Sequence, residues 1–328
     1  MLTVVSQRSW RARSNASLLV ACASGAAALV MVQTAAADMQ LTAEGIAKGF
    51  ALTTFATGFG SSGGVGPIGI DFQDDGTVLV TSYVGGTINR FNNTDNQTLA
   101  GAPALNYPAD EFAHDVSHIG STLYASRYNH QDLIALNADG SFNHTVASGI
   151  GNARANIVNP HTNHIYVSTV QGLREINPIS GAVSNFASEE SDGITLSLDG
   201  SVLYGAIISG PLSGHLIGYN TANGAKVFDS GFIGGGLDGT AIGFGERTGY
   251  IYGNLNNGSV IEINLNTNEI VTIATGGSRG DFCTADPTGS GDVLLTQSDR
   301  IMRLSGIPSP GVMAVGGIGM AGLLRRRR

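Results

Sequence analysis

The chain has 328 residues, of which 42% are hydrophobic and 13% are charged, with 47 glycines, two cysteines and a formal net charge of −8. An acidic balance disfavours binding to nucleic acid or to anionic lipid, because the phosphates of both attract basic surfaces. Two cysteines exclude a small fold held together by several disulfides, whereas the length is sufficient for a large hydrophobic core.

The N-terminal end has the three parts of a secretory signal peptide. A basic head precedes an apolar run over residues 18–32, and small residues follow, with Ala35 and Ala37 in an A-x-A arrangement. Signal peptidase recognises this order of parts. We therefore predict cleavage after Ala37, so that residues 1–37 are removed and the mature chain begins at Asp38.

Two other interpretations of this end stay open. The apolar run is only slightly shorter than a spanning helix, and in that case it would be retained as an anchor. The sequence Leu19-Val20-Ala21-Cys22 also resembles a lipoprotein cleavage box. A cut before Cys22 would leave almost no apolar segment ahead of it.

A repeating pattern of strands and turns begins at Phe50, after residues 38–49, which we expect to be a linker. The sequence beyond is rich in Gly, Val, Ile and Thr and has no helical periodicity. A unit of about 38 to 47 residues recurs, with short strands separated by turns rich in Asp, Asn and Gly. Clear turns of this kind are Asp75-Gly76 and Asp199-Gly200.

The number of units predicts the fold. Four-stranded units at this period are typical of a β-propeller. The last unit has room for only three strands, whereas residues 50–56 form a spare strand ahead of the first unit. We therefore predict an all-β, six-bladed β-propeller over residues 50–305, with the N-terminal strand closing the last blade. Seven blades or a two-sheet sandwich are the alternatives. The six units begin near Gly66, Ala113, Ala155, Gly193, Gly239 and Asp281.

This pattern resembles the broad superfamily of six-bladed propellers that includes NHL-repeat proteins, streptogramin-lyase-like proteins and the regucalcin/gluconolactonase group. The resemblance covers about residues 50–305 and rests on the repeat rather than on rare motifs. It therefore implies a fold more strongly than an activity.

Polar residues occur where a propeller would bring them to one mouth of its central channel. Loops that enter each innermost strand gather there, together with loops that join the second and third strands of each blade. Convergent polar groups around a channel are a common type of binding site, although a single Asp in such a loop often only caps a turn. The predicted ligand-binding residues are His114, Asp115, Arg127, His130, Arg154, Asn156, Asp192, Asp238, Arg279 and Asp281.

The resemblance also implies a divalent cation, Ca²⁺ or Mg²⁺, at this mouth. In the regucalcin/gluconolactonase group a Glu, an Asn and an Asp hold the metal, and Asp192-Gly193 and Asp238-Gly239 fall where that group has its Asn-Gly and Asp-Gly motifs. Val65 stands where the Glu is expected, so one ligand is missing. Because calcium prefers six to eight oxygen ligands, Asp192 and Asp238 alone would form a weak metal site.

Catalytic residues are not assigned. Streptogramin-lyase-like chemistry needs a His near a metal-bound Glu, and His114, His118 and His130 have only Glu111 near them in the sequence. The segment from Asp71 to Gly76 resembles the start of a calcium loop. Ser82 stands at its twelfth position, where a Glu is required, so we predict a β-turn instead.

The C-terminal end has the order of parts of a sorting tag. A Pro-x-Pro-Gly motif precedes an apolar stretch over residues 312–324, and arginines follow at once; they would hold the end of this stretch in the cytoplasm during export. The order resembles the PEP-CTERM signal, which an exosortase removes in that family, although Ser309 stands where the family name has Glu. A simple tail anchor is the alternative. The tag, residues 306–328, contains Pro308, Pro310, Gly311, Arg325, Arg326, Arg327 and Arg328.

The two ends imply a bacterial protein that is exported to the cell surface or the medium. Seven of the 17 Lys and Arg residues lie in these ends and all 25 Asp and Glu residues lie between them, so the part between has a net charge of about −15. We expect a monomeric, non-enzymatic propeller that binds an extracellular polysaccharide or a surface protein through its channel face. Its processing partners would be signal peptidase and an exosortase-like protease, with contact to the membrane only in transit and none to nucleic acid. The alternative is a secreted metal-dependent lactonase-like or lyase-like enzyme.

Overall fold

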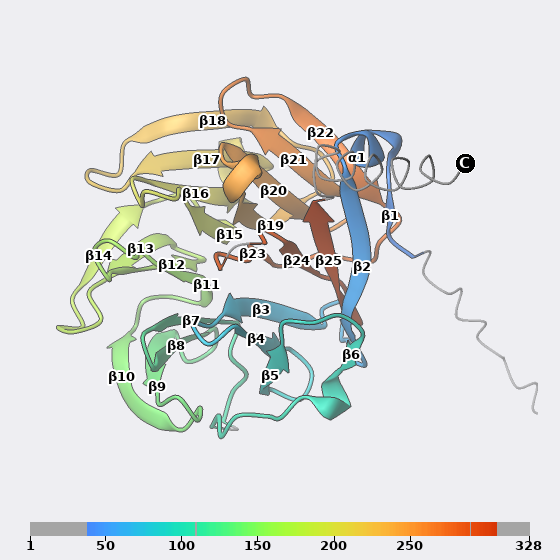
Figure 1. Cartoon of the computed structure of the whole chain (residues 1–328). Coiled ribbons are helices and arrows are strands. Elements are labelled where there is room, and N and C mark those ends of the chain that lie inside the picture. The colour runs from blue at the N-terminus through green and yellow to red at the C-terminus, as the bar shows by residue number, and fades with distance from the viewer. Residues whose placement is uncertain (1–37, 109, 289, 307–328) are drawn as a thin grey trace, which may run out of the picture. The chain divides into compact units, whose positions relative to one another are not determined.

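The computed structural model describes residues 38–108, 110–288 and 290–306. Within these residues the chain forms six sheets around a central axis, with one helix of five residues and three short 3₁₀ turns (Figure 1). The predicted all-β, six-bladed propeller is confirmed. Both predicted ends, with the cleavage residues Ala35 and Ala37 and the tag from Pro308 to Arg328, lie outside the described residues.

Each blade is an antiparallel sheet whose strands follow one another from the axis outward. Blade 1 contains β3 (Pro67–Phe72), β4 (Thr77–Ser82) and β5 (Ile88–Asn92). Blade 2 contains β7 (Asp115–Ile119), β8 (Thr122–Arg127), β9 (Asp132–Leu136) and β10 (Phe142–Ser148). Blade 3 contains β11 (Ala153–Val158), β12 (Ile165–Thr169), β13 (Gly172–Ile176) and β14 (Val183–Ala187). Blade 4 contains β15 (Ser191–Leu196), β16 (Val202–Ile207), β17 (His215–Asn220) and β18 (Lys226–Phe232). Blade 5 contains β19 (Leu237–Ile242), β20 (Tyr250–Leu255), β21 (Val260–Asn264) and β22 (Ile270–Thr275). Blade 6 contains β23 (Cys283–Ala285), β24 (Val293–Thr296), β25 (Arg300–Gly306) and β2 (Phe50–Thr57).

Asp-Gly turns connect the first two strands of blades 1 and 4, as the repeat predicts. In blade 1 the Asp75 side chain accepts a hydrogen bond from the backbone N–H of Thr77 at 2.9 Å, and Gly76 has a φ of +79°. Asp199 accepts from the N–H of Ser201 at 3.0 Å in the same way in blade 4. These side chains satisfy backbone donors that a tight turn leaves free.

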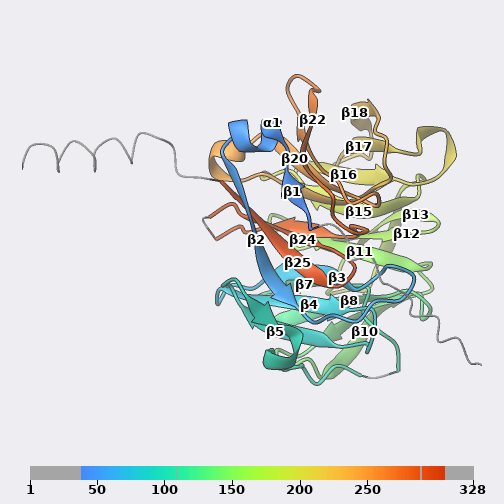
Figure 2. The same cartoon turned by 90° about the vertical axis from the view of Figure 1, so that its right-hand side faces the viewer.

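The spare N-terminal strand closes the ring, as predicted. β2 runs antiparallel to β25 from Phe50 opposite Gly306 to Thr57 opposite Arg300, and Figure 2 shows it along the outside of blade 6. Beyond it, the two-residue strand β6 (Gln97–Thr98) pairs with its end in parallel. The outer edge of the last blade therefore comes from the opposite end of the chain, which makes closure depend on both ends.

The segment 38–49, expected as a linker, is structured and packs on blade 5. It contains β1 (Gln40–Leu41), which pairs with β22, and helix α1 (Ala43–Ala47), whose N-cap Thr42 accepts from the N–H of Gly45 at 3.0 Å. Lys48 follows the helix and its Nζ lies 2.8 Å from the buried Glu262 carboxylate. The folded domain therefore begins before β2, the strand that closes the ring.

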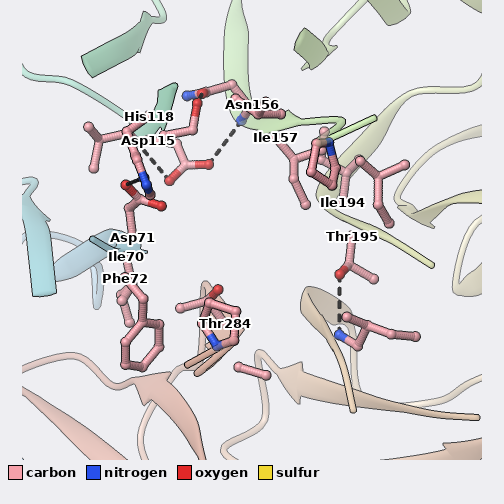
Figure 3. A pocket seen from close by; sticks show the side chains of 18 of the residues that line it. Ile70, Asp71, Phe72, Asp115, His118, Asn156, Ile157, Ile194, Thr195 and Thr284 are labelled. Carbon is pink, nitrogen blue, oxygen red and sulfur yellow. Dashed lines mark hydrogen bonds and ion pairs between the residues drawn. The ribbon is translucent and has the colours of Figure 1, made fainter. Parts of the chain in front are cut away.

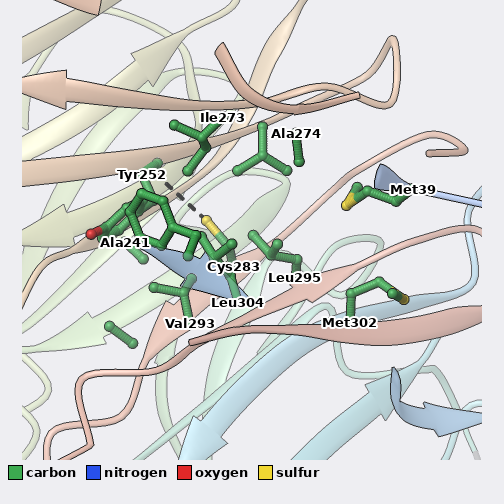
Figure 4. Close-up of a cluster of buried hydrophobic side chains, with 13 residues drawn as sticks. Met39, Ala241, Tyr252, Ile273, Ala274, Cys283, Val293, Leu295, Met302 and Leu304 are labelled. Carbon is green, nitrogen blue, oxygen red and sulfur yellow. Dashed lines mark hydrogen bonds between the residues drawn. The ribbon is translucent and has the colours of Figure 1, made fainter. Parts of the chain in front are cut away.

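The core is divided into six clusters of apolar side chains, one at each interface between neighbouring blades. Figure 4 shows the cluster between blades 5 and 6, in which Tyr252, Leu295 and Leu304 pack around Cys283. The Cys283 thiol is 6% exposed and donates to the Tyr252 carbonyl at 3.7 Å. Burial raises its pKa far above the ordinary value, which is typical of a core cysteine rather than a reactive thiol.

The innermost strands come closest near their starts. A Cβ on Gly193 would overlap the carbonyl oxygen of Asp238, and one on Gly239 would overlap that of Asp281. Side chains of the second strands also bridge neighbouring blades: Ser168 Oγ donates to Asp192 O at 2.8 Å and Asn254 Nδ2 donates to Phe282 O at 3.0 Å. These contacts make a narrow part of the channel, which lies between its two ends. We call them the strand-entry end, where innermost strands begin, and the turn end, where they turn into second strands.

Candidate functional site at the strand-entry end

Charged side chains from four blades meet at the strand-entry end. Arg154 Nη2 lies 2.9 Å from Glu190 Oε1, and Arg154 Nε lies 3.8 Å from Asp192 Oδ1. Arg279 Nη2 lies 2.9 Å from Asp281 Oδ1 and 3.6 Å from Asp238 Oδ2. We call these six residues the charged cluster: Arg154, Glu190, Asp192, Asp238, Arg279 and Asp281.

The charged cluster has more acidic than basic groups, and the pKa values of its carboxyl groups are raised. Burial raises the pKa of Asp238 well above its usual range, and the neighbouring carboxylates of Asp192 and Asp281 raise it further. Burial also raises the pKa of Asp281 to about 6, although Arg279 opposes this. Two guanidiniums therefore do not fully compensate four carboxyl groups, and the site favours a proton, a cation or hydrogen-bond donors.

Several polar atoms of the charged cluster have no hydrogen-bond partner among the described residues. They are Arg154 Nη1, Asp238 Oδ2, Arg279 Nε and Asp281 Oδ2, all of them buried. Leaving one such group without a hydrogen bond costs about 1–3 kcal/mol. Unpartnered donors and acceptors side by side are what a ligand with several hydroxyl groups can satisfy.

A row of aromatic rings borders this cluster. The ring centroids of Tyr83 and Phe112 lie 4.7 Å apart, those of Phe112 and His114 5.0 Å, and those of His114 and Tyr128 5.2 Å. All four rings, which we call the aromatic row, are half-buried. Burial lowers the pKa of His114 to about 4, with a further contribution from the Arg154 charge. His114 is therefore a neutral ring at neutral pH.

Asp115 and Asn156, both predicted as ligand-binding residues, have structural partners in the narrow part of the channel. Asp115 accepts from the backbone N–H groups of Val116 and Asn156, each at 2.9 Å, and both side chains are almost fully buried. Burial raises the pKa of Asp115 well above its usual range. These contacts join β7 to β11 across two blades.

Arg127, the last residue of β8, and His130, in the loop after it, lie apart from the charged cluster. Arg127 donates to both carboxylate oxygens of Asp132, at 2.9 and 2.6 Å, and to Asp110 at 3.0 Å. His130 Nε2 lies 3.6 Å from Asp110 and its side chain is 40% exposed. The bidentate pair fixes the Arg127 guanidinium. Of the ten predicted residues, the structure therefore brings together His114, Arg154, Asp192, Asp238, Arg279 and Asp281.

Sequence analysis did not single out Glu190, Tyr83 or Phe112. Glu190 lies two residues before Asp192 in the same entry loop, so its position in the sequence could have predicted that it belongs to the site. Tyr83 and Phe112 come from loops of different blades, and their contact depends on how the blades pack.

Comparisons with known proteins agree on the fold. No family model matches the chain, and no curated protein matches its sequence. Among solved structures, a gluconolactonase from Xanthomonas campestris matches with a TM-score of 0.66 and 15% identity, over 83% of this chain and 96% of that one. A regucalcin from Agrobacterium tumefaciens, described as a calcium-binding protein, matches at 0.58 and 14%, over 78% and 95%. A streptogramin B lyase matches at 0.57 and 13%, over 79% and 98%.

These values define the class of protein as a six-bladed β-propeller similar in fold to lactonase, regucalcin and lyase structures. At such identities the likeness extends to the fold alone. Among the residues that the structure describes, no helix is both long enough and apolar enough to span a membrane.

The implied metal ligands do not form the expected three-ligand arrangement. Val65 offers no oxygen from its side chain, and Arg279 already supplies a positive charge to Asp238 and Asp281. Residues 38–108, 110–288 and 290–306 contain no group of three or more His, Cys, Asp or Glu side chains placed to hold a metal ion. The residues present therefore do not match the site that the resemblance implies.

Proposed function

We propose that this protein is an exported binding propeller that recognises a neutral glycan through the strand-entry end of its channel. The observation that carries this proposal is the aromatic row lying beside the charged cluster. Aromatic faces provide apolar area with little conformational freedom to lose, which suits the C–H face of a sugar ring. Carboxylates and guanidiniums form the stronger, charge-assisted hydrogen bonds to hydroxyl groups.

The charge balance supports a neutral glycan rather than an acidic one. The charged cluster contains four carboxyl groups and two guanidiniums, and its unpartnered atoms include both donors and acceptors. The central part of the chain has a net charge of about −15. A uronic-acid polymer would be repelled at long range, whereas a neutral sugar is not.

Binding is tested with the purified protein and soluble oligosaccharides of glucose, galactose, N-acetylglucosamine and glucuronic acid, followed by calorimetry. A neutral oligosaccharide should bind, and Tyr128→Ala should weaken that binding by about tenfold or more, the loss of one aromatic anchor. Phe232→Ala is the matched control, because Phe232 is an aromatic residue that is 75% exposed on blade 4. Equal losses in both variants, or tighter binding of the uronic-acid oligosaccharide, would contradict the proposal.

Export and processing are a separate part of the proposal and rest on the two ends of the sequence. Signal peptidase would cut after Ala37, and an exosortase-like protease would remove the tag near Pro308, leaving the propeller at the cell surface or in the medium. Mass spectrometry of the protein from its native host tests this. Termini at Asp38 and near Pro308 are expected, and a final product that still contains Arg328 would mean that the tail is an anchor.

A second candidate is a secreted lactonase-like or lyase-like enzyme, and fold similarity to a gluconolactonase and a streptogramin B lyase favours it. This candidate requires Ca²⁺ or Mg²⁺ at Asp192 and Asp238, although the third carboxylate ligand is missing. Elemental analysis of the purified protein, together with lactone hydrolysis before and after treatment with a chelator, tests this candidate. One metal equivalent and chelator-sensitive hydrolysis would favour the enzyme over the binding protein.

A further inference from the structure

The turn end of the channel contains a cavity of about 470 Å³ that sequence analysis did not anticipate. Its wall is formed by the innermost strands of all six blades, from Ile70 in blade 1 to Ala285 in blade 6, and by turns that follow them, and it reaches back to Asp115 and Gly193 near the starts of two strands. Figure 3 shows side chains from several blades around this open space. Pockets for small molecules span about 300–1,000 Å³, so the volume is that of a ligand site.

One side of the cavity is polar and rigid. His118 Nδ1 lies 2.7 Å from Asp71 Oδ2, and Gln73 Nε2 contacts the same oxygen. Asp74 lies 3.4 Å from the other ring nitrogen of His118. The hydrogen bond that His118 donates to Asp71 raises the pKa of His118 to about 9, so the two side chains form an ion pair at neutral pH. Among the hydrogen bonds of the described residues, those to the Asp71 carboxylate use Oδ2, which leaves Oδ1 available.

The opposite side is apolar. Ile194, Leu196 and Ile242 line it from blades 4 and 5, and Phe282 adds an aromatic ring from blade 6. Figure 3 places Asp71 and His118 across the open space from Ile194. A ligand in this cavity therefore meets hydrogen-bonding groups at one edge and hydrocarbon at the other.

The charged residues in the wall of this cavity favour an uncharged ligand over an anion or a cation. Its lining contains three aspartates and no Lys or Arg, so an anion would find only His118, whose charge is already paired with Asp71. A cation would have to compete with His118 for the Asp71 and Asp74 carboxylates, and with two backbone N–H groups for Asp115. An uncharged ligand meets neither cost, because it leaves the ion pair intact and donates to the free oxygen of Asp71.

We propose that the turn end is a second binding site, which takes an uncharged amphipathic small molecule. A hydroxyl group of the ligand donates to Asp71 beside His118, and its hydrocarbon body packs against Ile194, Ile242 and Phe282. This site is distinct from the glycan site, because the lining of the cavity shares no residue with the charged cluster or the aromatic row. The two proposals therefore stand or fall independently.

Three probes with one tail test the ligand class: 1-octanol, octylammonium and octanoate, each titrated into the purified protein at pH 7. We expect saturable 1:1 binding of 1-octanol, with both charged probes at least tenfold weaker. Binding of octanoate as tight as that of 1-octanol would overturn the proposal, and so would no binding of 1-octanol up to its solubility limit.

Three variants test the location. Thr284 lines the cavity, so Thr284→Phe should fill it and abolish binding of 1-octanol. If that variant does not fold, Asp71→Asn provides a second test, because an amide presents a weaker acceptor to the hydroxyl and should weaken binding several-fold. Phe232→Ala, on the outside of blade 4, should bind 1-octanol as the parent does. Unchanged binding in a folded Thr284→Phe or Asp71→Asn protein would place the ligand elsewhere and refute this site.

Discussion

The two ends of the channel differ in how their charged groups are balanced. At the strand-entry end, four carboxyl groups share two guanidiniums, and the pKa values of Asp238 and Asp281 rise because burial and like charges oppose ionisation. At the turn end, the pKa of His118 rises because an opposite charge, Asp71, stabilises the imidazolium. The first end has buried polar atoms without hydrogen-bond partners among the described residues, whereas the second pairs His118 with Asp71 and contains a cavity.

The difference follows from which parts of the chain build each end. The strand-entry end is made largely of loops, which tolerate dense polar residues because they do not have to pack between blades. The turn end is made largely of strand residues such as Ile194 and Ile242, which also serve the blade cores. The strand-entry end can therefore be recognised from polar residues clustered in the sequence. The turn end is recognised only from the cavity in the structure.

Removing the closing strand β2 should unfold the propeller and so destroy both ends of the channel. This is the largest effect that we predict. A chain that begins at Gly58 lacks β2 and leaves β25 with an unpaired edge, so we expect no cooperative thermal transition. A chain that begins at Thr42 lacks only β1 and should remain folded with a modestly lower midpoint. A cooperative transition close to that of the parent in the Gly58 chain would show that the ring does not depend on this closure.

Gly239→Ala should damage the close packing of the innermost strands in the narrow part of the channel. The added Cβ meets the backbone of Asp281 and Phe282, which cannot move without shifting β23. We expect a loss of about 3 kcal/mol in the free energy of unfolding, at the upper end of overpacking effects. Gly234→Ala is the matched control because a Cβ there has open space. Urea denaturation of both variants checks this, and equal stabilities would contradict close strand packing at Gly239.

Asp238→Asn tests whether the charged cluster is strained by its own carboxylates. Because the folded-state pKa of Asp238 lies well above its unfolded value, ionisation opposes folding, and this cost grows as pH rises from about 4. We expect the variant to be more stable than the parent at pH 8, by about 1–3 kcal/mol, with little difference at pH 4.

Asp199→Asn is the matched control for that experiment. Ser197 and Ser201 lower the pKa of Asp199 to about 2 in an exposed turn, so its stabilising effect is present above about pH 4 and is lost as pH falls. The two substitutions should therefore have opposite signs at pH 8. A loss of stability in Asp238→Asn at that pH would mean that the cluster stabilises the ionised carboxylate.

Much of the fold could be predicted from the sequence because the repeat is local. Asp75-Gly76 and Asp199-Gly200 mark turns within single blades, and the spare strand at residues 50–56 was recognised from a missing partner in the last unit. The exact outer elements could not be predicted in the same way. β1 and α1 in residues 38–49 depend on contacts with β22 and Glu262, which lie more than 200 residues away.

The candidate sites were predicted less completely, for a related reason. Entry-loop residues such as Arg154 and Asp281 occupy equivalent positions of the repeat and could be grouped without coordinates. Arg127 was grouped with them, although Asp132 pairs with it across the β8–β9 hairpin, and that pairing could have been inferred from the short spacing. The Asp71–His118 pair needs the stacking of blade 1 on blade 2, which no local pattern reports.

Asp71→Asn should have the smallest effect on stability and tests the charge balance of the turn end. The folded-state pKa of His118 is about 9, above the unfolded value of about 6.5, so the ion pair stabilises the fold fully below about pH 6.5 and loses that effect as pH rises through 9. At acidic pH the pair is limited by protonation of Asp71, whose own pKa burial raises. The variant should therefore be less stable than the parent by about 1 kcal/mol near pH 6, a value typical of a partly exposed pair, and the two should converge at pH 10. Thermal melts across this range measure the difference, and NMR titration of the His118 ring should give a pKa near 6.5 in the variant. A difference in stability that persists unchanged at pH 10 would show that Asp71 stabilises the fold through Gln73 or packing rather than through its ion pair with His118.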